Sequence, residues 1–98
     1  MPSRRPTAHP GKILLRKFLV PSGLSANGLA LALRVPANRI GAITNGKRAI
    51  TADTALRLAR YFGTTPEFWM SLQARFDLSV ARTAQGRRIR KDVRPRGT

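Results

Sequence analysis

The feature of the sequence that most constrains its fold is a series of closely spaced signals for helix starts. Ser25, Thr51 and Thr65 are residue types that cap helix N-termini through a side-chain oxygen, and Pro36 and Pro66 suit a first helical turn. Between these signals, apolar residues recur three or four positions apart, as on one face of an α-helix. The pattern therefore predicts an all-α protein built from short helices.

Five helices are expected from this spacing. Their predicted ranges are 11–19, 25–33, about 37–45, 51–62 and 65–81, with Pro21, Gly23, Asn45, Gly46 and Gly63 at or near their ends. The alternating run LALAL at 29–33 also fits a strand, but no other segment offers a strand to pair with it. A helix is the better interpretation of that run.

Length and composition indicate one domain with two basic ends. The chain has 98 residues, of which 42% are hydrophobic, enough for one modest core. Residues 10–81 form the predicted domain, residues 1–9 a flexible arm, and residues 82–98 a disordered Arg-rich tail, because the apolar period ends after Ala81. With no cysteine, the chain can form neither a disulfide nor a thiolate metal site.

The charge of the chain indicates a polyanionic partner. There are 19 Lys and Arg against four acidic residues, a formal net charge of +15. Double-stranded DNA is the first candidate, because cations that neutralise phosphates release condensed counterions. An acidic protein or an anionic membrane would also suit this charge, but the apolar runs are too short to span a bilayer and no signal peptide is recognisable. We therefore expect a cytoplasmic protein.

Catalysis is not expected from this sequence. The four acids, Asp53, Glu67, Asp77 and Asp92, are dispersed, and His9 is the single histidine. Neither a metal site nor a nucleophile with its base can be assembled within one chain. The prediction is a binding protein with no enzyme activity, no metal and no cofactor.

The segments 25–33 and 37–45 have the spacing of a helix-turn-helix, in which the second helix enters the major groove of DNA. Asn38 can contact an adenine edge, and Arg39 a guanine or a phosphate. The predicted base-reading residues are Ala37, Asn38, Arg39, Gly41 and Ala42, and the predicted phosphate-binding residues are Ser25, Asn27, Thr44, Asn45, Lys47 and Arg48. For Asn45 and Gly46, ordinary helix capping is an equal alternative.

Several motifs carry a family resemblance over about residues 9–81. They are HPGKILLRKFL, GLSANGLALALRVPANRI and NGKRAITADTALRLARYFGTTPEFWMSLQ. These motifs closely resemble the HigA/VapI-type antitoxins of bacterial toxin–antitoxin modules, within the larger Xre/Cro repressor class. The resemblance implies a compact five-helix, lambda-repressor-like domain. It also implies a homodimeric autorepressor that neutralises a RelE-like, ribosome-dependent endoribonuclease, the HigB-type toxin.

Several positions depart from the family pattern, and two of them bear on the site. Arg34 stands where glycine is usual in the turn, so we expect it either to adopt a left-handed conformation at a cost of roughly 1 kcal/mol or to reshape the turn. Leu31 stands where relatives are commonly basic, and helical phase directs it away from the core. We hypothesise that Leu31 belongs to a partner surface.

A homodimer would place two recognition helices about 34 Å apart on an inverted-repeat operator. Apolar residues that continue to the end of the last predicted helix indicate the dimer interface. The predicted interface residues are Trp69, Phe76, Leu78 and Val80. Two alternatives stay open: a stand-alone Xre-type regulator without a toxin, and a non-specific nucleic-acid-binding protein driven by its arginine-rich ends.

Overall fold

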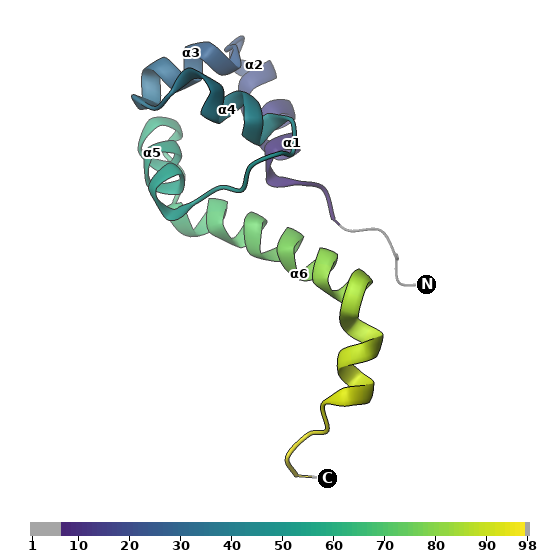
Figure 1. Cartoon of the computed structure of the whole chain (residues 1–98). Helices are drawn as coiled ribbons and strands as arrows, with labels where there is room; N and C mark the ends of the chain where they lie inside the picture. The colour runs from purple at the N-terminus through teal and green to yellow at the C-terminus, as the bar shows by residue number, and fades with distance from the viewer. Residues whose placement is uncertain (1–6, 98) are drawn as a thin grey trace.

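Helices make up all the regular secondary structure of residues 7–97, the part of the chain that this computed structural model describes. The elements are α1 Pro10–Leu14, η1 Leu15–Leu19, α2 Val20–Ser22, α3 Ala26–Leu33, α4 Ala37–Thr44, α5 Ala52–Phe62 and α6 Pro66–Asp92 (Figure 1). Because α1, η1 and α2 follow one another without a break, they form one helix, and the predicted five-helix fold is confirmed. Most of the predicted flexible arm, residues 1–6, lies outside the described part.

The first helix runs past its predicted end at Leu19 to Ser22. The element η1 is a turn of π-helix, in which the N–H of Val20 donates to the carbonyl of Leu15 five residues earlier. Pro21 has no N–H and would crowd the preceding turn of a regular α-helix, and the wider π turn accommodates it. The helix ends where Gly23 adopts the left-handed conformation, with φ 68°.

The predicted capping residues act as expected. The Oγ of Ser25 accepts from the N–H of Gly28 at 2.9 Å, and Thr51 and Thr65 cap α5 and α6 in the same way. Asn45 and Gly46 both end α4, as predicted. Gly46 is left-handed with φ 75°, whereas Asn45 stays right-handed with φ −85°.

The core lies between the first helix, the α3–α4 pair, α5 and the first turns of α6. Its largest fully buried side chains include Leu14, Leu29, Ile40, Leu58 and Trp69. Trp69 has none of its surface exposed, and its indole N–H donates to the hydroxyl of Thr64 at 2.7 Å. The prediction that Trp69 lies in the dimer interface is therefore wrong, because its helical phase turns the ring into the core of its own chain.

The last helix is longer than predicted. α6 continues for 27 residues to Asp92, so the prediction of a disordered tail from residue 82 is wrong for residues 82–92. That prediction depended on the loss of the apolar period, but Ala, Arg, Gln and Lys favour helix without an apolar face. Figure 1 shows the far part of α6 bending as it projects from the other helices, and the molecule measures 52 × 24 × 22 Å.

Within residues 7–97, no helix has both the length and the apolar character that crossing a bilayer requires.

Candidate nucleic-acid interface

The α3–α4 pair is joined by the short turn 34–36. Leu29 and Leu33 of α3 and Ile40 and Ile43 of α4 are buried in one cluster, as the predicted contact between the two helices requires. Arg34 has φ 60° and ψ 44°, which confirms the left-handed alternative for this position. Its backbone conformation lets the N–H groups of the turn satisfy carbonyls at the end of α3.

The outer face of α4 is small and nearly neutral. Ala37, Asn38 and Asn45 are exposed, whereas Gly41 and Ala42 are half-buried by their own helix and its neighbours. A Cβ atom added to Gly41 would meet no heavy atom within 4 Å, so the space in front of this residue is open. A flat face of this kind allows the backbone of α4 to approach a partner closely.

Arg39 lies on the flank of α4 and not on its outer face. Its Nη1 lies 3.4 Å from Oδ2 of Asp53 in α5, and 22% of its side chain is exposed. The Nε of Arg39 is buried and has no hydrogen-bond partner within the described part of the chain. A base or phosphate contact by Arg39 therefore requires its ion pair with Asp53 to open.

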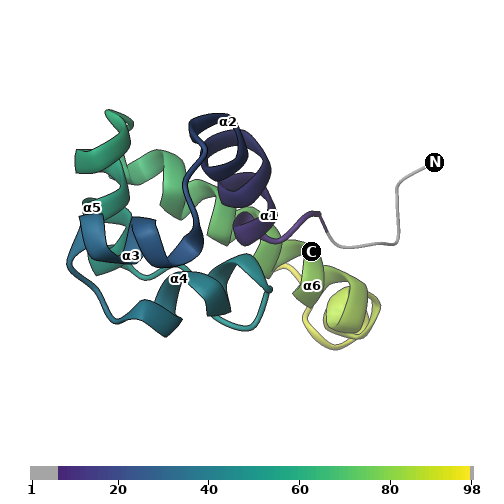
Figure 2. The ribbon, with the colours of Figure 1, turned by 90° about the horizontal axis from the view of Figure 1, so that it is seen from above.

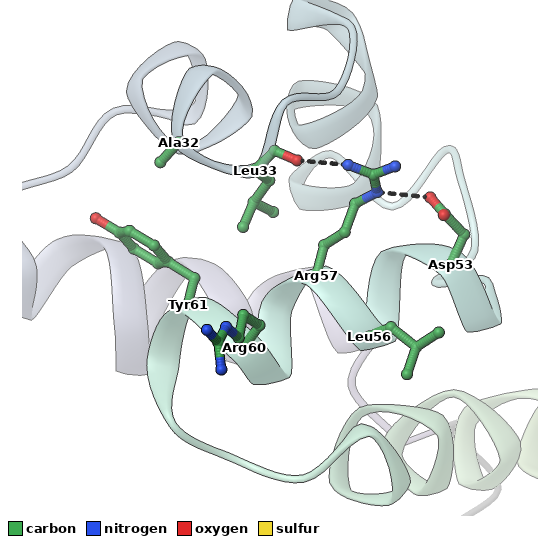
Figure 3. A pocket seen from close by; sticks show the side chains of 7 residues that line it. All are labelled: Ala32, Leu33, Asp53, Leu56, Arg57, Arg60 and Tyr61. Carbon is green, nitrogen blue, oxygen red and sulfur yellow. Dashed lines mark hydrogen bonds and ion pairs between the residues drawn. The ribbon is translucent and has the colours of Figure 1, made fainter.

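Arg57 is a residue that sequence reasoning missed. Its Nη1 donates to the carbonyl of Leu33 at 2.9 Å, and its Nε donates to Asp53 at 3.0 Å (Figure 3). The guanidinium thus satisfies a carbonyl at the C-terminus of α3 while the shared carboxylate also pairs with Arg39. The i, i+4 spacing of Asp53 and Arg57 predicts their ion pair, but no local pattern predicts the contact with α3.

Leu33, Asp53 and Arg57 also line a hollow between α3 and α5 with a volume of about 540 Å³. Exposed Leu56 and Tyr61 of α5 border it, and Arg60 lies beside them (Figure 3). Leu31 of α3 has 75% of its surface exposed, which confirms that it points away from the core.

The predicted phosphate-binding residues fall into two groups. Lys47 and Arg48, in the loop after α4, are exposed and form no ion pair with any acid of residues 7–97. Asn27 and Asn45 are exposed too. By contrast, the Oγ of Ser25 caps α3 and the hydroxyl of Thr44 donates to the carbonyl of Gly41 at 3.0 Å, so both already have partners.

The start of the first helix fixes the end of α4. Gly11 is buried, and a Cβ atom there would overlap the carbonyl oxygen of Ile43. His9 caps the helix, because its Nδ1 accepts from the N–H of Gly11 at 2.9 Å, and its ring lies 4.8 Å from that of Phe76 in α6. Partial burial lowers the pKa of His9, and the nearby carboxylate of Asp77 opposes this effect.

Gln73 is a second residue that the sequence did not reveal. It lies on the inner face of α6 with 5% of its surface exposed, and its Oε1 accepts from the N–H of Ile50 at 2.8 Å. Its Nε2 donates to Asp77 at 2.9 Å. Because Ile50 ends the loop that carries Lys47 and Arg48, Gln73 holds this basic loop against α6.

Of the remaining predicted interface residues, Phe76 is half-buried beneath His9, whereas Leu78 and Val80 have 52% and 40% of their surface exposed. Residues 7–97 contain no group of three His, Cys, Asp or Glu side chains that could hold a metal ion. Nothing in the described site provides convergent catalytic groups.

Two short packed helices, a tight turn and an open outer face on the second helix define a helix-turn-helix protein. The helix-turn-helix family matches residues 15–69, which is more than half of the chain. The chain belongs to this family of DNA-binding regulators, which is not a family of enzymes.

Individual relatives agree with this assignment. Virulence-associated protein I of Dichelobacter nodosus is 51% identical over 76 residues, which cover 78% of this chain and 70% of that protein. The structure of an addiction module antidote protein of the HigA family from Coxiella burnetii is 50% identical, with a TM-score of 0.88 over 93% of this chain and 99% of that one. The structure of the Pseudomonas aeruginosa antitoxin HigA with the higBA promoter is 42% identical, with a TM-score of 0.90 over 94% of this chain and 99% of that one.

Proposed function

We propose that this protein is a homodimeric, sequence-specific DNA-binding antitoxin. It represses its own promoter and neutralises a cognate mRNA endonuclease toxin of the RelE/HigB type. The observation that carries the proposal is the open outer face of α4, whose small side chains are flanked by the unpaired cations Lys47 and Arg48. A protein acting on promoter DNA in this way works in the bacterial cytoplasm.

The residues of α4 have different roles in the proposed recognition of DNA. Asn38 is the exposed polar side chain able to form a bidentate contact with adenine, and Ala37 and Ala42 suit thymine methyl groups. Gly41 allows the helix backbone to approach the bases. Arg39 contributes to base reading only after leaving Asp53, so in the free protein its role is to brace α4 against α5.

Contacts with phosphates fix the register of the helix on the duplex. Lys47 and Arg48 are the strongest candidates because each has its full charge available, and exposed Asn27 and Asn45 add neutral donors. Ser25 and Thr44 contribute only if their hydroxyl groups share their present partners with a phosphate.

The homodimer would join two protomers through the projecting part of α6. Leu78 and Val80 are its exposed apolar residues nearest the domain, with Phe76 at the edge. Two recognition helices held about 34 Å apart would read an inverted repeat. Substitution of Leu78 by Lys is expected to shift the sedimenting mass from dimer to monomer at micromolar concentration, and an unchanged dimer would contradict this assignment.

Similarity to proteins named as HigA antitoxins supports the toxin-binding part of the proposal. Leu31 is our candidate for the toxin-binding surface, because a leucine with 75% of its surface exposed beside the α3–α5 hollow favours an apolar contact. Leu31→Lys should then weaken binding to the toxin and leave DNA binding intact. Unchanged affinity for the toxin would remove Leu31 from the surface.

The DNA-binding part can be tested without knowing the operator. A duplex selected from a random-sequence pool by the wild-type protein is compared with a scrambled duplex of equal composition, with fluorescence anisotropy as the readout. We expect a clear preference for the selected duplex, and we expect Asn38→Ala to reduce it by roughly 1 to 3 kcal/mol. Equal binding of both duplexes by the wild-type protein would favour the alternative of a non-specific nucleic-acid-binding protein.

The toxin part needs a separate experiment. Co-expression with a neighbouring small reading frame of the RelE type should yield a stable complex and relieve growth arrest. If no such reading frame exists, or if its product neither arrests growth nor binds this protein, a stand-alone Xre-type regulator without a toxin becomes the better proposal.

A further inference from the structure

The inner face of α6 changes character along its length. Trp69, Gln73 and Phe76 follow one another at helical spacing and face the body of the protein. Continued at the same four-three spacing, this stripe passes through residues 80 and 83 and reaches Arg87 and Arg90. The face that packs in the core thus becomes a basic face where the helix projects.

The basic part of this stripe has no acid to neutralise it. Arg87 and Arg90 are exposed, and neither forms an ion pair with any acid of residues 7–97. The nearest acid in sequence, Asp92, is paired with Arg88 at 3.7 Å. Held on a helix, the two free guanidinium groups lie one turn apart on the same side.

This stripe begins beside the loop that follows α4. The ring of His9 packs on Phe76 at 4.8 Å, and a Cβ atom added to Gly46 would lie 3.9 Å from the same ring. In addition, the N–H of Thr7 donates to the hydroxyl of Ser79 at 3.0 Å. Figure 2 shows the loop after α4 and the far end of α6 on the same side of the molecule, and Figure 1 shows that the far end of α6 projects well away from this loop. The start of the stripe therefore adjoins the loop that carries Lys47 and Arg48, and its basic end lies farther out on the same side.

The curvature of α6 has a local cause. The hydroxyl of Ser79 donates to the carbonyl of Phe76 at 2.9 Å, and that of Thr83 donates to the carbonyl of Ser79 at 2.8 Å. Hydroxyl groups that bond to the preceding helical turn often bend a helix. Gly86 adds flexibility one turn later, since glycine weakens a helix interior.

We infer that the inner face of α6 around Arg87 and Arg90 is a second DNA-binding element, which contacts phosphates of the duplex beyond the segment read by α4. The inference rests on the proposed function, in which α4 faces DNA, and it adds a contact that carries no sequence information. A second copy of the chain is a poorer occupant of the part around Arg87 and Arg90, because it would bring like charges together. The dimer contact proposed above uses Leu78 and Val80, which lie nearer the domain. Single-stranded RNA is also a poorer partner for this face, because the stripe presents no exposed aromatic ring on which a base could stack.

The test compares two double substitutions on different sides of the same helix. R87Q/R90Q removes the two cations of the inner face, and R75Q/R82Q removes two exposed cations of a flank of α6, so both variants lose the same charge. Binding to the scrambled duplex is measured by anisotropy at several salt concentrations. Circular dichroism checks that each variant retains its helix content.

R87Q/R90Q is expected to lower the slope of log affinity against log salt by about 1.8 per protomer, since each phosphate contact contributes about 0.9. R75Q/R82Q should change the slope much less. Equal changes for the two variants, or none for R87Q/R90Q, would overturn the inference. The assignment to DNA would also be overturned if R87Q/R90Q abolished binding to a single-stranded RNA and left the duplex slope unchanged, or if it altered only the dimer mass.

Failure of the proposed function gives a different result. In that case the wild-type protein would not prefer its selected duplex over the scrambled one, whatever the salt slope of the α6 variants. The two conclusions can therefore fail independently.

Discussion

Substitution of Gly41 by Ala should raise the stability of the protein and weaken its binding to DNA. Gly41 lies inside α4, and a Cβ atom there meets no heavy atom within 4 Å, so the methyl group causes no clash in the free protein. The full difference in helix propensity is then available, about 0.8 to 1.0 kcal/mol. For a domain of this size, the melting temperature should rise by roughly 4 to 8 °C.

On DNA the same methyl group has the opposite effect. It projects from the outer face of α4 into the space through which the backbone would approach the bases. Forcing one additional methyl group into a close-packed contact costs about 1 to 3 kcal/mol. Affinity for the selected duplex should therefore fall by roughly 5-fold to 150-fold, which anisotropy titration measures directly.

Gly86→Ala is the matched control for this experiment. It also replaces a glycine inside a helix, and its Cβ atom would make only an ordinary contact, 3.9 Å from the Cβ of Arg82. This variant should leave the preference for the selected duplex over the scrambled one unchanged, because α4 is untouched and the proposed α6 contact carries no sequence information. If Gly41→Ala were more stable yet bound the selected duplex as tightly as the wild type, the reasoning about close backbone approach would be refuted.

Three further predictions concern the residues that position the site. Gln73→Ala leaves the buried N–H of Ile50 without an acceptor and should lower the free energy of unfolding by about 1 to 3 kcal/mol in urea denaturation; an unchanged midpoint would deny Gln73 its structural role. Gly11→Ala should destabilise the fold by several kcal/mol, because the added methyl group meets the backbone at Ile43 and neither chain segment can move easily; a melting temperature within a degree of the wild type would contradict the close contact. Since burial lowers the pKa of His9 below its ordinary 6.5, its contribution to stability is present above that pH and is lost as the pH falls through the folded value; His9→Asn, which can still cap the helix, should flatten this dependence in unfolding measured from pH 8 to 5.

Local signals predicted most of the fold. Ser25, Thr51 and Thr65 cap helices as their residue types indicate, because the capping hydrogen bond spans only three residues. The left-handed conformation of Arg34 was one of two alternatives that followed from the family resemblance, because glycine is usual at this position of the turn. Interactions between residues that lie close together in the chain could therefore be predicted from the sequence.

Contacts between distant segments could not be predicted in this way. Arg57 reaches a carbonyl 24 residues earlier, and Gln73 reaches an N–H 23 residues earlier. Neither hydrogen bond produces a periodic pattern of residue types in the sequence. A buried glutamine also interrupts the apolar pattern by which a core-facing side of a helix is recognised. The continuation of α6 after Ala81 was not predicted either. The apolar pattern ends there because no core is present, and helix propensity alone maintains the helix.

The recognition surface that we propose is separate from the part of α4 that holds the fold together. Ile40 and Ile43 carry the packing of the helix, while Asn38 and Gly41 face outward and support nothing behind them. Changes on the outward side can therefore alter which sequence is bound while leaving the rest of the protein in place. Paralogous copies of such a regulator in one cell could diverge to separate promoters through a few substitutions on one side of a two-turn helix.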